Sequence, residues 1–224
     1  MADQDVAQLS GPTFGPLDGG DPRQLVILLH GVGADGNDLI GLAPHWAQQL
    51  PGALFLSPDG PEPYDMAPFG RQWFSLMDRT PELVSAGIAG AAPVLTRFID
   101  AALAQLGLDE GALALVGFSQ GTMMALHVAL TRARPVAALV GYSGALAGPE
   151  AAAGAFRSRP PVMLVHGDGD DVVPVERHHD TVESLRAADV AVTAHVRPGL
   201  GHGIDDEGLG LGGAFLAAAF STQP

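Results

Sequence analysis

Six short runs of apolar residues, separated by stretches of helical periodicity, constrain the fold of this chain more than any other feature. The runs lie at 25–30, 53–57, 113–117, 136–143, 162–166 and 190–196. Helical patterns occur at 37–49, 81–106, 121–133, 175–188 and 208–220. Strands that are continuously apolar are typical of a parallel sheet covered by helices on both faces. The sequence therefore predicts an α/β fold.

Length and composition narrow the class of protein. The chain has 224 residues, of which 47% are apolar, so we expect one domain spanning residues 1–224. No run of 18 or more apolar residues occurs, which predicts no membrane insertion. The first 16 residues lack the basic and apolar regions of a secretory signal. The absence of cysteine excludes disulfides, thiolate metal sites and a cysteine nucleophile, and we expect a cytoplasmic protein.

The charge balance limits the partners. The net charge is -14, with 11 Lys and Arg against 25 Asp and Glu. Nucleic acids and anionic membrane surfaces require a cationic face, so neither is expected as a partner. Neutral or cationic substrates are favoured, although an acidic surface that serves only solubility explains the charge equally well.

A serine between two glycines stands where an apolar run meets a helical pattern. The segment "GFSQG" follows "LALV" and places Ser119 between Gly117 and Gly121. Because the chain contains 30 glycines, the G-x-S-x-G pattern alone is weak evidence, and its context must decide. A strand, a sharp turn and a helix at one serine predict a nucleophile elbow, which lifts the hydroxyl above the sheet edge. The alternative is an ordinary glycine-rich turn.

A serine nucleophile needs a histidine base and a carboxylate that orients it. Ligands bind beyond the carboxyl ends of parallel strands, so the partners should follow apolar runs. Asp168, Asp170 and Asp171 follow the run at 162–166, and His202 follows the run at 190–196 within a glycine-rich loop. The order serine, aspartate, histidine is that of α/β-hydrolases. Asp170 is favoured and Asp168 is its main competitor, since aspartates in turns often only cap the backbone.

Catalysis of acyl transfer also needs two donors aimed at the developing oxyanion. The residue after the nucleophile supplies one, which is the backbone N–H of Gln120 at the start of its helix. The glycine-rich loop after the run at 25–30 suggests the backbone N–H of Val32 as the second donor. A simple turn leading to a helix cap is the alternative for that loop.

Five segments together resemble the phospholipase/carboxylesterase family of small α/β-hydrolases, which includes bacterial carboxylesterases and eukaryotic acyl-protein thioesterases. They are "LLHGVGADGNDL", "RQWFSL", "GFSQG", "HGDGDDVVP" and "GLGHGI", and the resemblance covers about residues 11–220. It implies an α/β-hydrolase fold with a mostly parallel central sheet and no large lid domain. It also implies Ser119, Asp170 and His202 as the catalytic triad, with Val32 and Gln120 as oxyanion donors. Family members often pair, which allows a homodimer.

The predicted function is a serine carboxylesterase that hydrolyses short- to medium-chain esters through an acyl-enzyme. The partner is a small-molecule ester, and neither a cofactor nor a metal is required. Met66, Phe69, Trp73 and Phe74 are candidate substrate-binding residues, with ordinary packing as the alternative. Residues 58–82 look similar to bacterial members of the family, so protein depalmitoylation is not carried over from the eukaryotic thioesterases.

Three alternatives stay open. The same triad also serves thioesterases, lysophospholipases and peptidases. A hydrolase fold that only binds its ligand is a more distant alternative. A metallohydrolase using His166, Asp168 and Asp170 is the third, but "HGDGDD" contains no second histidine and no EF-hand pattern.

Overall fold

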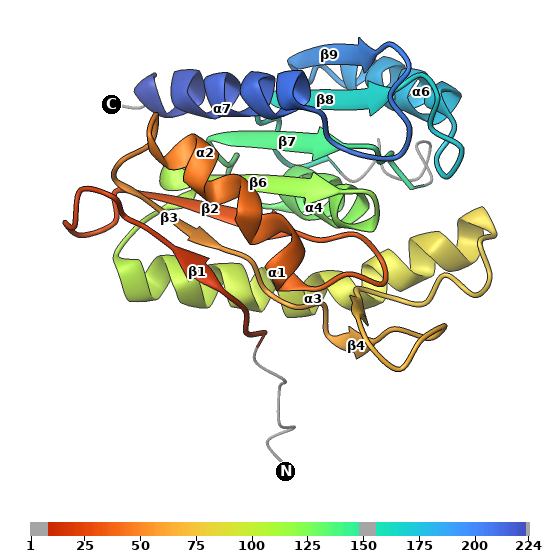
Figure 1. The fold of residues 1–224 in the computed structure, drawn as a ribbon, viewed down its shortest axis with the longest axis horizontal. Helices are drawn as coiled ribbons and strands as arrows, with labels where there is room; N and C mark the ends of the chain where they lie inside the picture. Colours follow the sequence, from red (N-terminus) through yellow and green to blue (C-terminus); the bar gives the residue numbers. More distant parts are fainter. Residues whose placement is uncertain (1–8, 148–155, 223–224) are drawn as a thin grey trace.

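A seven-stranded sheet forms the centre of the computed structural model, which describes residues 9–147 and 156–222 (Figure 1). Its strand order is β1-β3-β2-β6-β7-β8-β9. Only β1 is antiparallel to its neighbour, and every other pair is parallel. The strands are β1 (Thr13–Phe14), β2 (Gln24–Leu29), β3 (Ala53–Leu56), β6 (Leu113–Phe118), β7 (Ala138–Tyr142), β8 (Val162–Gly167) and β9 (Val192–Arg197). All six predicted apolar runs therefore coincide with strands of one sheet.

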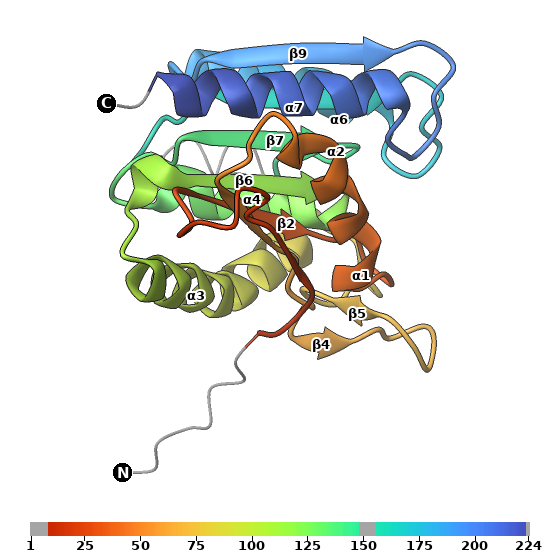
Figure 2. The ribbon, with the colours of Figure 1, turned by 60° about the vertical axis from the view of Figure 1, so that its left-hand side comes forward.

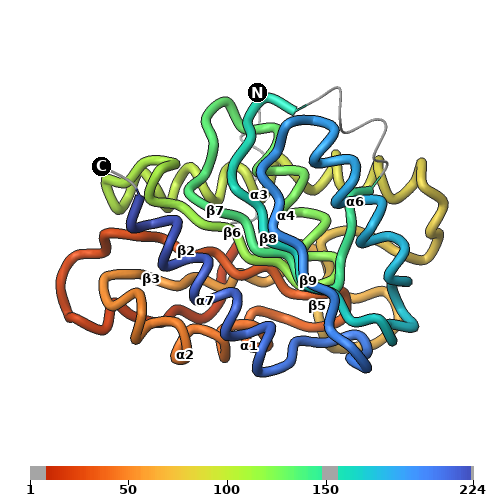
Figure 3. The backbone as a smooth tube through the Cα atoms, turned by 90° about the horizontal axis from the view of Figure 1, so that it is seen from above, coloured from red at the N-terminus to blue at the C-terminus, as the bar shows by residue number. Residues whose placement is uncertain are grey.

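Helices cover both faces of this sheet (Figures 2 and 3). One face carries α3 (Pro81–Leu106), α4 (Gln120–Thr131) and α6 (Val175–Ala187). The other carries α1 (Gly36–Leu39), α2 (Ala43–Ala47) and α7 (Asp206–Ser221). The predicted α/β-hydrolase architecture, with a mostly parallel sheet between two helical layers, is confirmed. No large lid domain is present in the part of the chain that the structure describes.

The strands are apolar on both sides because helices pack against both faces of the sheet. Along β2, Leu25 and Ile27 pack into the core formed with α3 and α4, whereas Val26 and Leu28 pack into the core formed with α2 and α7. All four residues are fully buried. Burial of each such side chain is worth about 1.5–3 kcal/mol relative to exposure, so both cores stabilise the same strand.

The structure differs from one predicted helix and contains short elements that were not predicted. The helix predicted at 37–49 is divided into α1, a 3-10 turn at Ile40–Leu42 and α2, where Pro44 occupies the first turn of α2. Helix α3 runs without a break from Pro81 to Leu106, with Pro93 inside it. The short strand β1 and the hairpin of β4 (Glu62–Pro63) with β5 (Arg71–Gln72) were not predicted, because two-residue strands leave no periodicity to detect.

Helix α3 has a length and mean hydropathy that would allow it to cross a membrane. Within the described residues it is the only helix that meets these two criteria. Its buried residues, including Ile88, Leu95 and Ile99, pack into the core on one face of the sheet. The first eight residues, which contribute to the prediction of no secretory signal, lie outside the described residues.

Candidate active site

Ser119 lies in a strained turn between β6 and α4, at the carboxyl edge of the sheet. Its φ of 53° and ψ of -115° are unusual for a residue with a side chain, and its backbone N–H donates to the carbonyl of Tyr142 at 2.9 Å. A Cβ atom added at Gly121 would lie 1.8 Å from the carbonyl oxygen of Leu29. One added at Gly117 would lie 2.4 Å from the backbone nitrogen of Thr122. The turn therefore requires both glycines for steric reasons, as the sequence pattern predicts.

Asp170 and His202 meet at the same edge. The Nδ1 atom of His202 lies 2.8 Å from Oδ2 of Asp170, and the Asp170 carboxyl group is fully buried. The other oxygen, Oδ1, accepts backbone N–H groups of Val172 at 2.9 Å and Val173 at 2.8 Å. Asp170 therefore caps its own turn with one oxygen and holds an imidazole with the other.

The environment of Asp170 favours its ionised form. Burial alone would raise the pKa of this carboxyl group, but hydrogen bonds from the Val173 backbone, His202 and the Val172 backbone outweigh burial, so its pKa is lowered. A carboxylate at this position orients His202 with its Nδ1 atom carrying the proton. The Nε2 atom is then left free to accept one.

His202 lies beside the nucleophile elbow. Its ring is 4.9 Å, centroid to centroid, from the ring of Phe118, the residue that precedes Ser119. The hydroxyl of Ser143 donates to the carbonyl of Gly203 at 3.3 Å, which ties the His202 loop to the end of β7. Among the described residues, no hydrogen bond joins the Ser119 hydroxyl to His202. Such contacts are often long in hydrolases without substrate and shorten only in the reacting complex.

Two backbone N–H groups near Ser119 have no partner among the described residues. They belong to Gln120, the first residue of α4, and Val32, in the loop after β2. An added Cβ at Gly31 would lie 3.4 Å from Cβ of Ser119, which places this loop directly against the serine. The loop is held by the β5 strand, because Gly33 donates its N–H to the carbonyl of Arg71 at 2.8 Å.

The side chain of Gln120 joins the elbow to the segment after β5. Its Oε1 accepts the backbone N–H of Trp73 at 3.0 Å, and its Nε2 donates to the carbonyl of Phe74 at 2.7 Å. Trp73 and Phe74 are buried and line a groove of about 590 Å³ beside the first half of α3. Met66 and Phe69 are 68% and 75% exposed in the connection between β4 and β5, and they do not line this groove.

The remaining candidate residues have other contacts. Asp168 accepts the N–H of Gly199 through Oδ1 at 2.6 Å, and Asp171 is exposed. Three or more His, Cys, Asp or Glu side chains gathered closely enough to hold a metal ion do not occur in residues 9–147 and 156–222. The ligand set considered for a metallohydrolase, His166, Asp168 and Asp170, is therefore not assembled.

Sequence reasoning missed two polar residues that support the site. Ser143 has a φ of 46° and holds the His202 loop, but a serine at a strand end carries no distinctive pattern. His166 lies against Asp170, with Nε2 at 3.3 Å from Oδ2. Its position four residues before Asp170 is visible in the sequence, but there it suggested only a metal ligand.

A parallel sheet between two helical layers, with a serine elbow and an aspartate–histidine pair at its carboxyl edge, defines an α/β-hydrolase with the parts of a serine esterase. Comparison with known proteins identifies the family. The family model described as Phospholipase/Carboxylesterase matches residues 18–219, and the chain belongs to this family. The resemblance inferred from the sequence is therefore confirmed, as is the class of serine hydrolases that act on small-molecule esters.

Individual relatives agree with this assignment. Esterase YpfH from Escherichia coli K12 is 32% identical over 189 residues, which cover 84% of this chain and 79% of the relative. Acyl-protein thioesterase 1 from Saccharomyces cerevisiae is 27% identical over 68% of this chain and 73% of its own length. The crystal structure of esterase PE8 superposes with a TM-score of 0.90 at 39% identity, covering 95% of this chain and 99% of that one.

Proposed function

We propose that this protein is a carboxylesterase in which Ser119 is the nucleophile, His202 the general base and Asp170 the residue that orients His202. The backbone N–H groups of Val32 and Gln120 stabilise the oxyanion. The substrate is a carboxylic ester of short to medium acyl length. Neither a metal nor a cofactor takes part in the proposed steps.

The reaction proceeds through an acyl-enzyme. The Ser119 oxygen attacks the ester carbonyl while Nε2 of His202 accepts the hydroxyl proton, and the carbonyl oxygen becomes an oxyanion near the two free N–H groups. His202 then returns the proton to the alcohol as the bond from carbonyl carbon to alkoxy oxygen breaks. A water molecule, deprotonated by the same nitrogen, attacks the acyl-enzyme and releases the acid and free Ser119.

One observation supports this proposal above the others. The pair of His202 Nδ1 and Asp170 Oδ2 at 2.8 Å lies at the same sheet edge as a serine held in a strained turn. Strain of this kind persists only where surrounding structure fixes it, and it occurs most often where a side chain must be presented for chemistry. A purely binding hydrolase fold would not need this combination.

The replacement Ser119→Ala tests the nucleophile. We expect a loss of about 10⁴-fold or more in kcat for aryl esters, because the acyl-enzyme can no longer form. A fluorophosphonate probe should label the wild-type protein once per chain and leave the variant unlabelled, as read by intact-protein mass spectrometry. Esterase activity that survives in a correctly folded Ser119→Ala variant would exclude this mechanism.

The groove beside α3 is proposed to hold the acyl chain. Its lining includes Trp73 and Phe74, whose backbone groups hydrogen-bond the side chain of Gln120, the residue that follows the proposed nucleophile. Four of the six α3 residues that line it are small, namely Ala86, Gly87, Gly90 and Ala91, and the other two are Leu83 and Val94. An added Cβ at Gly87 would lie 2.6 Å from the ring of Phe74, whereas one at Gly90 would meet nothing within 4 Å. Gly90 therefore leaves open space where a longer acyl chain can lie.

The variant Gly90→Leu tests this assignment. A leucine should fill part of the groove and lower kcat/KM for octanoyl esters about 10-fold relative to acetyl esters. Gly210→Leu is the matched control, because Gly210 is also an exposed helical glycine with nothing within 4 Å of an added Cβ. Equal chain-length profiles for wild type, Gly90→Leu and Gly210→Leu would place the acyl chain elsewhere.

A thioester is the second candidate substrate. Several relatives carry the name acyl-protein thioesterase 1, and the proposed machinery attacks an oxyester and a thioester in the same way. The ratio of kcat/KM for an oxyester and a thioester of the same acyl chain distinguishes the two functions.

Three further properties stay predictions. They are a single domain over residues 1–224, a cytoplasmic location and a homodimer. Analytical ultracentrifugation would test the homodimer.

A further inference from the structure

A buried histidine lies behind the proposed triad. His166 is near the end of β8, and its side chain is fully buried. Its Nε2 atom lies 2.8 Å from the carbonyl oxygen of Val173 and 3.3 Å from Oδ2 of Asp170. The same Oδ2 atom is the partner of His202 Nδ1 at 2.8 Å. Two imidazoles therefore share one carboxylate oxygen.

The surroundings of His166 define its tautomer. Its Nε2 atom faces two acceptors, a backbone carbonyl and a carboxylate, so Nε2 carries a proton. Its Nδ1 atom is buried and has no hydrogen-bond partner among the described residues. A second proton at Nδ1 would be a buried donor without an acceptor, which is unfavourable. The neutral form with the proton on Nε2 satisfies the contacts that the structure provides.

The titratable groups around His166 come from three elements. Asp170 and, beyond it, His202 come from the loops at the sheet edge. The ring of His178, on α6, lies 5.4 Å from the His166 ring, centroid to centroid. Burial, together with the neighbouring His166, His179 and His195, lowers the pKa of His178 to about 4. His178 is therefore uncharged at neutral pH and adds no cation to this cluster.

We propose that His166 is a positioning residue for the hydrolytic reaction, acting through Asp170. Its Nε2–H hydrogen-bonds the carbonyl of Val173, whose own N–H binds Oδ1 of Asp170, and the same ring nitrogen lies against Oδ2 at 3.3 Å, on the oxygen that faces His202. It thereby fixes the whole turn from Asp170 to Val173. It also shares the negative charge of Oδ2, which limits how strongly Asp170 stabilises protonated His202. This inference rests on the proposed function.

Two variants of His166 separate positioning from simple packing. A glutamine at this position can place its amide N–H near the location of Nε2, whereas a leucine fills the space without a donor. We expect His166→Leu to lower kcat by about 10- to 100-fold with KM nearly unchanged, because a small displacement of the base impairs proton transfer. The acidic limb of the pH dependence of kcat/KM should also move to higher pH. Without His166, Asp170 interacts with His202 alone and stabilises its protonated form more strongly. Compared with His166→Leu, His166→Gln should recover most of kcat and return the acidic limb to its wild-type position.

The control is His178→Leu, which removes a neighbouring buried imidazole that has no hydrogen bond to Asp170 in the described part of the chain. We expect this variant to keep the wild-type acidic limb, even if its thermal midpoint falls. If His166→Leu fails to fold, His166→Asn replaces it, because the shorter amide cannot reach Oδ2.

Two results would overturn the inference. One is a donor-free variant with wild-type kcat and pH profile; the other is equal impairment of the glutamine and leucine variants. The activity of Ser119→Ala separates the two proposals. If Ser119→Ala keeps its activity, the proposed function fails. If Ser119→Ala is inactive and His166→Leu is unaffected, only the role of His166 fails.

Discussion

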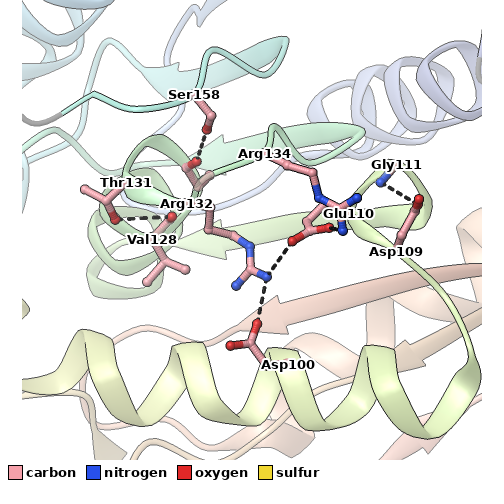
Figure 4. Close-up of polar contacts among 10 residues, drawn as sticks. Asp100, Asp109, Glu110, Gly111, Val128, Thr131, Arg132, Arg134 and Ser158 are labelled. Atoms are coloured by element: carbon pink, nitrogen blue, oxygen red, sulfur yellow. Dashed lines mark hydrogen bonds and ion pairs between the residues drawn. The ribbon is translucent and has the colours of Figure 1, made fainter.

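Two carboxylates with limited exposure, at opposite ends of the sheet, have different partners. Asp170 follows β8 at the carboxyl edge and contacts two imidazoles and two backbone N–H groups. Glu110 precedes β6 at the amino edge and contacts two guanidinium groups, those of Arg132 at 3.2 Å and of Arg134 (Figure 4). Arg132 also bridges to Asp100 on α3 at 2.7 Å.

The partners decide what each carboxylate can do. An arginine stays charged at every accessible pH, so the pairs around Glu110 keep a constant charge and serve to hold β6 and α4 to α3. An imidazole can accept and release a proton, so the charge beside Asp170 can change during a reaction. The lowered pKa of each carboxyl group keeps both ionised, since hydrogen bonds and nearby cations outweigh the effect of burial at both sites. Asp170 and Glu110 therefore differ in function because their partners differ, since both are ionised carboxylates.

The replacement Asp170→Asn should have the largest effect. The amide can still accept the N–H groups of Val172 and Val173, but its NH₂ group would face Nδ1 of His202 and favour the wrong tautomer. We expect kcat for aryl esters to fall about 10⁴-fold while the fold is retained. Steady-state kinetics and circular dichroism measure the two effects.

Asp168→Asn and Asp171→Asn are the matched controls for this change. An asparagine at 168 keeps the oxygen that accepts the N–H of Gly199, and Asp171 is exposed. Both variants should retain most of the activity. Equal losses in all three variants would mean that the choice of Asp170 among the three aspartates is wrong.

Much of this site could be predicted because parallel strands end at one edge. The elbow pattern selected Ser119, and the strand-end rule selected the loops that carry His202 and the three candidate aspartates, which the structure brings to one edge of the sheet. The elbow glycines were predictable because the close approach of α4 to β2 leaves no space for a Cβ at Gly121. The short, continuously apolar runs were a similarly clear signal for a parallel sheet covered on both faces.

Contacts that depend on tertiary packing could not be predicted. The role of His166 depends on the turn that brings Asp170 back over the end of β8, and no local pattern records that turn. Met66 and Phe69 are candidate substrate-binding residues by their apolar character, and their exposure in the connection between β4 and β5 could not be predicted from the sequence. The helix predicted at 37–49 is interrupted near Pro44, because periodicity reports an apolar face and not the continuity of a helix.

Glu110→Gln makes the same chemical change at the opposite end of the sheet, and we expect it to leave kcat unchanged. It removes the charge that pairs with Arg132 and Arg134, so the free energy of unfolding at pH 7 should fall by about 1–3 kcal/mol. Asp100→Asn, on the exposed side of the same network, should cost no more than about 1 kcal/mol. Urea denaturation of the three proteins, with aryl ester kinetics alongside, measures both effects. A loss of kcat in Glu110→Gln would contradict the contrast between a purely structural role for Glu110 and a role in the reaction for Asp170.

The pH dependence of stability gives a second comparison of the wild-type protein with Glu110→Gln. Because the pKa of folded Glu110 is below its ordinary value of 4.5, its ionisation adds stability that is fully present above that pH and is lost as the pH falls through the folded pKa. The stability difference between wild type and Glu110→Gln should therefore be largest at neutral pH and shrink below about pH 4.5. A difference that stays constant down to pH 3 would show that the glutamine acts through packing, and that the charge of Glu110 does not stabilise the amino edge.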